Sequence, residues 1–209
     1  MLYYEKRNGV KHMDQAKYFI GFEKTLKLFQ GIFNIFYWVV IIGMFLSLGV
    51  MIAGIFVPLH TLHDILTVKG LTFYFHSSYK IDAYHIQIAK LRTLIINACI
   101  LHEIILTVLL FITIQLKSIV QFVRNKQPFS KCCIKRIQYL AYGVIVYSFI
   151  LGLLGNVWDL LLVRTLQLSQ TVISLNFNFG MMIMGCLILF LSHVFKYGAY
   201  LQEEYDSTL

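Results

Sequence analysis

The sequence has little charge and almost no proline. Only 13% of its 209 residues are charged, two are proline, and 58% are hydrophobic. Mean hydropathy is +0.71. A soluble domain of this length exposes too much surface to be so apolar, so the composition argues against a soluble globular protein. It predicts a protein embedded in a membrane.

Motifs of the common enzyme and metal-site classes are also missing. There is no glycine-rich phosphate loop, and no cysteine pair has the C-x-x-C spacing of a metal or redox site. Cys99 and Cys186 lie in apolar runs, while Cys132 and Cys133 are neighbours in a basic segment. The stretch LHEIIL (101–106) has leucine where a zinc protease has its second histidine. We therefore expect no enzymatic activity, no cofactor and no disulfide framework.

Four apolar runs are each long enough to cross a bilayer, which needs about 20 residues. They cover residues 32–57, 93–116, 137–158 and 172–195. The remaining segments are a basic N-terminal segment, an outer segment, a basic loop, a short outer loop and an acidic tail, at 1–31, 58–92, 117–136, 159–171 and 196–209. This pattern predicts an all-α integral membrane protein, a four-transmembrane-helix bundle.

The distribution of lysine and arginine predicts how the chain is oriented. Thirteen basic residues lie in the N-terminal segment, the middle loop and the tail, against five on the other side. The positive-inside rule then places both termini and the loop in the cytoplasm of a plasma membrane. Because the net charge of +8 is explained by the ends of the spans, we expect no direct contact with nucleic acid.

Before the first span, aromatic residues and leucine recur at helical spacing between residues 18 and 29, with lysines at other positions. This pattern is typical of a basic amphipathic helix on the inner leaflet, held by apolar burial and anionic lipid. A helix packed on the cytoplasmic end of the bundle explains it equally well. The lipid bilayer is in either case a predicted partner.

The outer segment combines strand-favouring residues with a helical stripe. Residues 66–75 predict a short hairpin around Lys69-Gly70. A 3-4-3-4 apolar pattern that starts at Ile81 predicts that the second helix begins there and extends beyond the membrane. His60, His63 and Asp64 are weak candidates for zinc or copper ligands, because a helical turn would bring both imidazoles to one face. Histidines that cap helices and pack near the bilayer surface are the simpler interpretation.

The polar residues inside the predicted spans that could form a site are His102, Glu103 and Asn156. An ionisable group costs about 3 kcal/mol within a span, so Glu103 is expected to face the bundle interior. It either fixes helix packing or forms a ligand or proton site. Asn156 continues a series of small residues with Ser148 and Gly152 at steps of four, which predicts close helix packing.

Two stretches resemble a known family. They are QFVRNKQPFS with the following IKRI, between residues 121 and 137, and VFKYGAYLQEEYDSTL at 194–209. Both are similar to motifs of the uncharacterised bacterial four-span family known as domain of unknown function 2975. The resemblance implies a four-helix membrane protein without known enzymatic activity, often encoded beside a small helix-turn-helix regulator. Lys126 departs from the family pattern, which usually has glycine before the proline.

The same two stretches contain the candidate interaction residues. Pro128 is expected to end the second helix and Ser130 to cap the third. We predict that the acidic tail packs across the basic loop and pairs Glu203 or Glu204 with a loop residue, namely Arg124, Lys126 or Arg136. The full set of predicted cytoplasmic interaction residues is Arg124, Lys126, Pro128, Phe129, Lys135, Arg136, Glu203, Glu204 and Asp206.

These features favour a non-enzymatic membrane sensor or accessory protein that binds a cytoplasmic protein partner. A small helix-turn-helix regulator is the leading candidate for that partner. One alternative is an immunity protein that binds a membrane-active peptide or shields its receptor. Another is a small transporter or channel subunit. The sequence does not set the oligomeric state.

Overall fold

The computed structural model describes the backbone of residues 2–58, 61, 72–75, 79–82, 88–167 and 177–208, and the side chains of 23–58, 61, 90–167, 177–205 and 207. Its long elements are the helices α1 (Leu2–Phe56), α3 (Ile88–Arg124), α4 (Lys131–Leu166) and α5 (Phe179–Thr208). A short hairpin, β1 (Thr72–Phe75) and β2 (Tyr79–Asp82), lies between α1 and α3.

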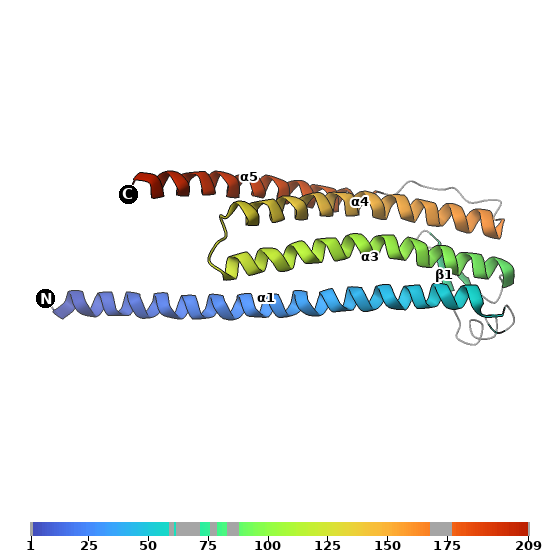
Figure 1. Ribbon diagram of the computed structural model, residues 1–209, viewed down its shortest axis with the longest axis horizontal. Helices are drawn as coiled ribbons and strands as arrows, with labels where there is room; N and C mark the ends of the chain where they lie inside the picture. Colours follow the sequence, from blue (N-terminus) through green and yellow to red (C-terminus); the bar gives the residue numbers. More distant parts are fainter. Residues whose placement is uncertain are drawn as a thin grey trace.

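Within the described residues, four helices are long and apolar enough to cross a membrane. They lie side by side in chain order, with both termini at the same end of the molecule (Figure 1). The extensive helix contacts join α1 to α3, α3 to α4 and α4 to α5. Their outward faces carry many exposed apolar side chains, as expected where lipid rather than water surrounds a helix. The prediction of an all-α, four-span membrane protein is confirmed.

The first helix is longer than the sequence pattern indicated. A single helix, α1, joins the N-terminal segment to the first span and extends over 55 residues, roughly 80 Å. The segment was predicted to be a helix that lies on the inner leaflet and leads into the span, or one that packs on the bundle; α1 instead continues from the segment into the span as one helix. No proline or tight turn interrupts the sequence between the two parts, so the helix continues. It ends at Phe56, next to Pro58.

The outer segment differs in part from its prediction. The described hairpin pairs residues 72–75 with 79–82, with Phe73 opposite Ile81 and Phe75 opposite Tyr79. Such apolar cross-strand pairs stabilise a hairpin, and the predicted turn at Lys69-Gly70 lies outside the described residues. Ile81 therefore belongs to β2, and α3 begins at Ile88. In the sequence YKID (79–82) apolar and polar residues alternate with period two, so the stretch fits a strand as well as the predicted helical stripe through Ile81.

Small residues set how closely the helices approach. A Cβ added at Gly143 would lie 3.1 Å from Ile112 Cγ1 on α3, and one at Gly185 would lie 2.5 Å from Ile145 Cγ1 on α4. Ser148 and Asn156 are buried on α4. The predicted series of small and polar residues therefore faces the bundle, in agreement with close packing.

The end opposite the termini has a compact core of Leu91, Leu94 and Leu162, all fully buried. Beside it, Arg92 donates a hydrogen bond from Nη2 to the backbone carbonyl of Val57. A cation suits the carbonyl end of α1, where the helix dipole is negative. This contact joins the end of α1 to the start of α3.

The last helix begins at Phe179 and not at residue 172, because Asn178 caps it. Asn178 Oδ1 accepts a hydrogen bond from the Met181 amide at 3.1 Å. The Asn178 carbonyl also accepts one from Ser148 Oγ at 2.7 Å. Ser148 lies midway along α4, so α5 starts beside the middle of α4 and then runs past the α3–α4 turn (Figure 1).

Candidate functional site

The α3–α4 turn, residues 125–130, is tightly defined by its backbone. The amide of Gln127 donates to the carbonyl of Phe122 at 3.0 Å, and the amide of Lys126 to that of Val123 at 3.1 Å. This pair of bonds is a Schellman motif, which requires a left-handed residue. Lys126 occupies that position, with φ of 58°.

The start of α4 follows at once. Pro128 cannot extend a helix, and Ser130 caps the next one by accepting a hydrogen bond from the Cys133 amide at 3.2 Å. The prediction that Ser130 is an N-cap is confirmed. The turn therefore holds Phe129 between the end of α3 and the start of α4.

Phe129 joins the turn to α5. Its ring centroid lies 5.6 Å from that of Phe195. A Cβ added at Gly198 would lie 3.2 Å from Phe129 Cε1, so the glycine leaves room for the ring. The two stretches that carried the family resemblance thus pack on each other.

An ion pair forms a second link between the turn and α5. Lys131 Nζ lies 3.0 Å from Glu203 Oε1, with the two side chains 80% and 64% exposed. The tail does meet the basic segment, but through Lys131 and not through the predicted partners. Pairs this exposed contribute only about 0 to 1 kcal/mol, so this one positions the side chains more than it stabilises the fold.

The predicted basic partners are engaged elsewhere. Arg124 Nη1 donates to Gln30 Oε1 on α1 at 2.8 Å, and Arg136 Nη1 donates to Gln115 Oε1 on α3 at 3.2 Å. Arg124 thus joins α3 to α1, and Arg136 joins α4 to α3. Lys117 does the same, because its Nζ donates to Asn34 Oδ1 at 2.9 Å and lies 4.2 Å from the Tyr37 ring centroid.

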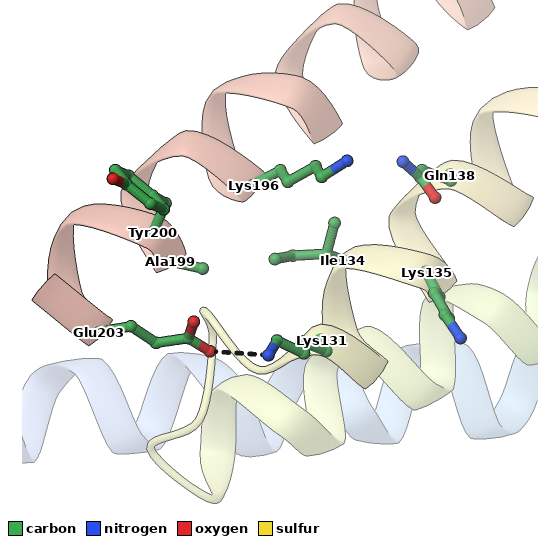
Figure 2. A pocket seen from close by; sticks show the side chains of 8 residues that line it. All are labelled: Lys131, Ile134, Lys135, Gln138, Lys196, Ala199, Tyr200 and Glu203. Atoms are coloured by element: carbon green, nitrogen blue, oxygen red, sulfur yellow. Dashed lines mark ion pairs between the residues drawn. The ribbon is translucent and has the colours of Figure 1, made fainter.

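A pocket of about 400 Å³ lies between the start of α4 and the end of α5. Figure 2 shows Lys196 reaching toward Gln138 on one side and the Lys131–Glu203 pair on the other. The apolar side chains of Ile134 and Ala199 lie between them (Figure 2); Lys135 and Tyr200 complete the lining. Of these residues, only Lys135 and Glu203 were among the predicted interaction residues. Lys196 could have been found from sequence, because it follows the last apolar residue of the fourth span.

Among the residues with described side chains, the remaining predicted ones do not line this pocket. Lys126 and Glu204 are exposed, and the side chain of Asp206 lies outside the described residues. Within the spans, His102 is exposed and Asn156 is buried. Glu103 has one buried oxygen, Oε1, without a hydrogen-bond partner among the described residues.

The weak metal candidates His60, His63 and Asp64 also lie outside the described residues, as does most of the outer segment. Within the described part of the chain, no group of three or more histidine, cysteine or acidic residues could hold a metal ion. The two adjacent cysteines differ: Cys132 is exposed and Cys133 is buried. Of these two thiols, that of Cys132 is therefore the one open to modification from solvent.

Comparison with known proteins identifies a family. No curated protein and no solved structure matches the chain. Residues 77–209, which include α3, α4, α5 and the whole pocket, match the family described as "Protein of unknown function (DUF2975)". This match covers more than half of the chain and includes both stretches that pack around Phe129. The chain is a multi-pass membrane protein that belongs to the DUF2975 family.

Proposed function

We propose that this protein is a non-enzymatic membrane sensor or accessory protein, and that the projecting end of α5 binds a cytoplasmic protein partner. The partner that the family resemblance favours is a small helix-turn-helix regulator. The supporting observation is an exposed stripe of two aromatic side chains and one aliphatic side chain at the end of α5.

The end of α5 projects beyond the α3–α4 turn (Figure 1). The helix has 30 residues, about 45 Å, whereas the hydrocarbon core of a bilayer is about 30 Å thick. Its C-terminal end passes the α3–α4 turn on the side of both termini (Figure 1). Because the apolar run of α5 ends at Phe195, residues 196–208 of the helix lie beyond the apolar region. Residues 197–205 are called the α5 extension here.

The α5 extension carries Tyr197, Leu201 and Tyr205 at steps of four, with 64%, 46% and 67% of their surfaces exposed. Residues at this spacing lie on one face of a helix. A groove on a partner protein typically receives such an apolar stripe. Glu203 and Glu204 lie on the same extension and would add charge selectivity at the rim.

The orientation predicted from lysine and arginine supports a cytoplasmic partner. It gives the α5 extension access to soluble proteins, such as transcriptional regulators, on that side of the membrane. A helix-turn-helix protein held there would be kept from its DNA until the membrane domain changes. This arrangement would let a signal in the bilayer reach transcription without an enzyme.

Site-specific photo-crosslinking in native membranes tests the proposal. A photoreactive phenylalanine analogue at Leu201 is compared with one at Phe190, which lies on the same face of α5, 66% exposed, within the apolar run. We expect a protein adduct from Leu201 that contains a DNA-binding regulator, and only lipid adducts from Phe190. Absence of a protein adduct at Leu201, or equal protein adducts at both positions, would contradict the proposal.

A further inference from the structure

We propose that the pocket between the start of α4 and the end of α5 binds the headgroup of an anionic phospholipid. This inference does not depend on the protein partner proposed above. Its basis is the charge of the pocket, its apolar floor and its place along the two helices.

The pocket is electropositive. Three lysines, Lys131, Lys135 and Lys196, line it together with a single acidic residue, Glu203. Lysine forms hydrogen bonds with phosphate oxygens as a donor of up to three protons. Basic pockets between membrane helices are a recurrent binding site for anionic headgroups. The net positive charge therefore selects an anion.

The floor of the pocket is apolar. Ile134 and Ala199 are 5% and 9% exposed and lie between the two polar sides (Figure 2). A free phosphate ion would gain nothing from this surface, whereas the glycerol and upper acyl carbons of a lipid would cover it. The volume of about 400 Å³ falls in the range of small-ligand sites, roughly 300 to 1,000 Å³. The combination favours an amphiphile.

The pocket also lies at the depth of lipid headgroups. On α5, Lys196 follows Phe195, the last residue of the apolar run. On α4, Lys131 and Lys135 precede the apolar run that begins at Ile137. A phosphate at this level can meet the lysines while its acyl chains lie along α4 and α5.

Glu203 competes with the lipid for Lys131. Because both side chains are largely exposed, solvent screens the ion pair, and a phosphate can displace the carboxylate. The geometry thus predicts that removing the carboxylate tightens lipid binding. A substitution that increases affinity is a useful test, since loss of folding cannot mimic it.

Native mass spectrometry of the full chain, released from detergent micelles with added lipid, tests the inference. We expect one phosphatidylglycerol molecule to remain bound about ten times more tightly than phosphatidylcholine. Glu203→Gln should increase phosphatidylglycerol affinity several-fold, and the double variant Lys131→Gln, Lys196→Gln should reduce it about tenfold. The matched control is Lys24→Gln with Lys27→Gln, which removes two exposed charges from α1 at the same end and should leave the bound lipid in place.

Three results would overturn the inference. The first is equal affinity for phosphatidylglycerol and phosphatidylcholine. The second is a loss of bound lipid in the α1 control as large as in the pocket variant. The third is displacement of the lipid by inorganic phosphate at equal concentration, which would identify a free-anion site. Unchanged or weaker binding in Glu203→Gln would likewise contradict the predicted competition.

Discussion

The substitution Lys126→Gly should stabilise the protein, because Lys126 has the left-handed backbone that a Schellman motif requires. Its φ is 58°, and its amide and that of Gln127 close the end of α3. The left-handed conformation costs an L-residue about 1 to 2 kcal/mol, while glycine loses about 0.5 to 1 kcal/mol more backbone entropy on folding. The side chain is exposed, so little packing is lost. We expect the free energy of unfolding to rise by about 1 kcal/mol.

Lys126→Ala is the matched control, since it removes the same charge and keeps the strained backbone. Unfolding by titration with a denaturing detergent, followed by helical circular dichroism, compares the two variants in the same micelles. The glycine variant should be more stable than the alanine variant by about 1 kcal/mol. If alanine were equal to or better than glycine, the left-handed conformation at this turn would not carry the cost assigned to it.

Three further predictions test other contacts by the same unfolding measurement. Gly185→Ala should lower the free energy of unfolding by about 1 to 3 kcal/mol, because the new methyl would lie 2.5 Å from Ile145 Cγ1 and 3.1 Å from the Ile145 amide nitrogen. Gly155→Ala, with nothing within 4 Å, should be neutral or stabilising by up to about 1 kcal/mol; equal losses at both glycines would refute the packing at Gly185. Ser130→Ala should cost about 1 kcal/mol through loss of the cap to Cys133, and Ser130→Asp should restore it, whereas no loss would mean that the cap is dispensable. Glu103→Gln should change stability by less than about 0.5 kcal/mol, because Glu103 Oε1 has no partner among the described residues; a loss above about 2 kcal/mol would indicate that the carboxyl group makes a contact essential to the fold.

The sequence predicted the features that depend on local chemistry. Apolar runs of bilayer length predicted four spanning helices, and all four are found. The hydroxyl of Ser130 predicted a helix start, because capping needs only a side-chain oxygen three residues before an amide. The meeting of the turn with the end of α5 followed from the even number of spans. That meeting is where Phe129 packs on Phe195.

Features that depend on side-chain reach could not be predicted in the same way. Arg124 and Arg136 were expected to pair with the tail, but each donates a hydrogen bond to a glutamine on a neighbouring helix. Residue spacing in the sequence does not show at which level along the neighbouring helix such a glutamine lies. Glu203 instead pairs with Lys131. The start of α3 was misplaced because residues 79–82 fit both a strand and a helix. Choosing between them requires the cross-strand partner Phe73.

The proposed function places the α3–α4 turn and the α5 extension on the cytoplasmic side, and labelling of Cys132 tests this most directly. Cys132 is exposed at the start of α4, while Cys99 and Cys133 are buried and the exposed Cys186 lies within the fourth apolar helix. A thiol reagent that cannot cross membranes should label the protein in inverted vesicles and not in intact cells, and Cys132→Ser should abolish that labelling. Labelling of Cys132 from outside intact cells would reverse the orientation and contradict a cytoplasmic partner.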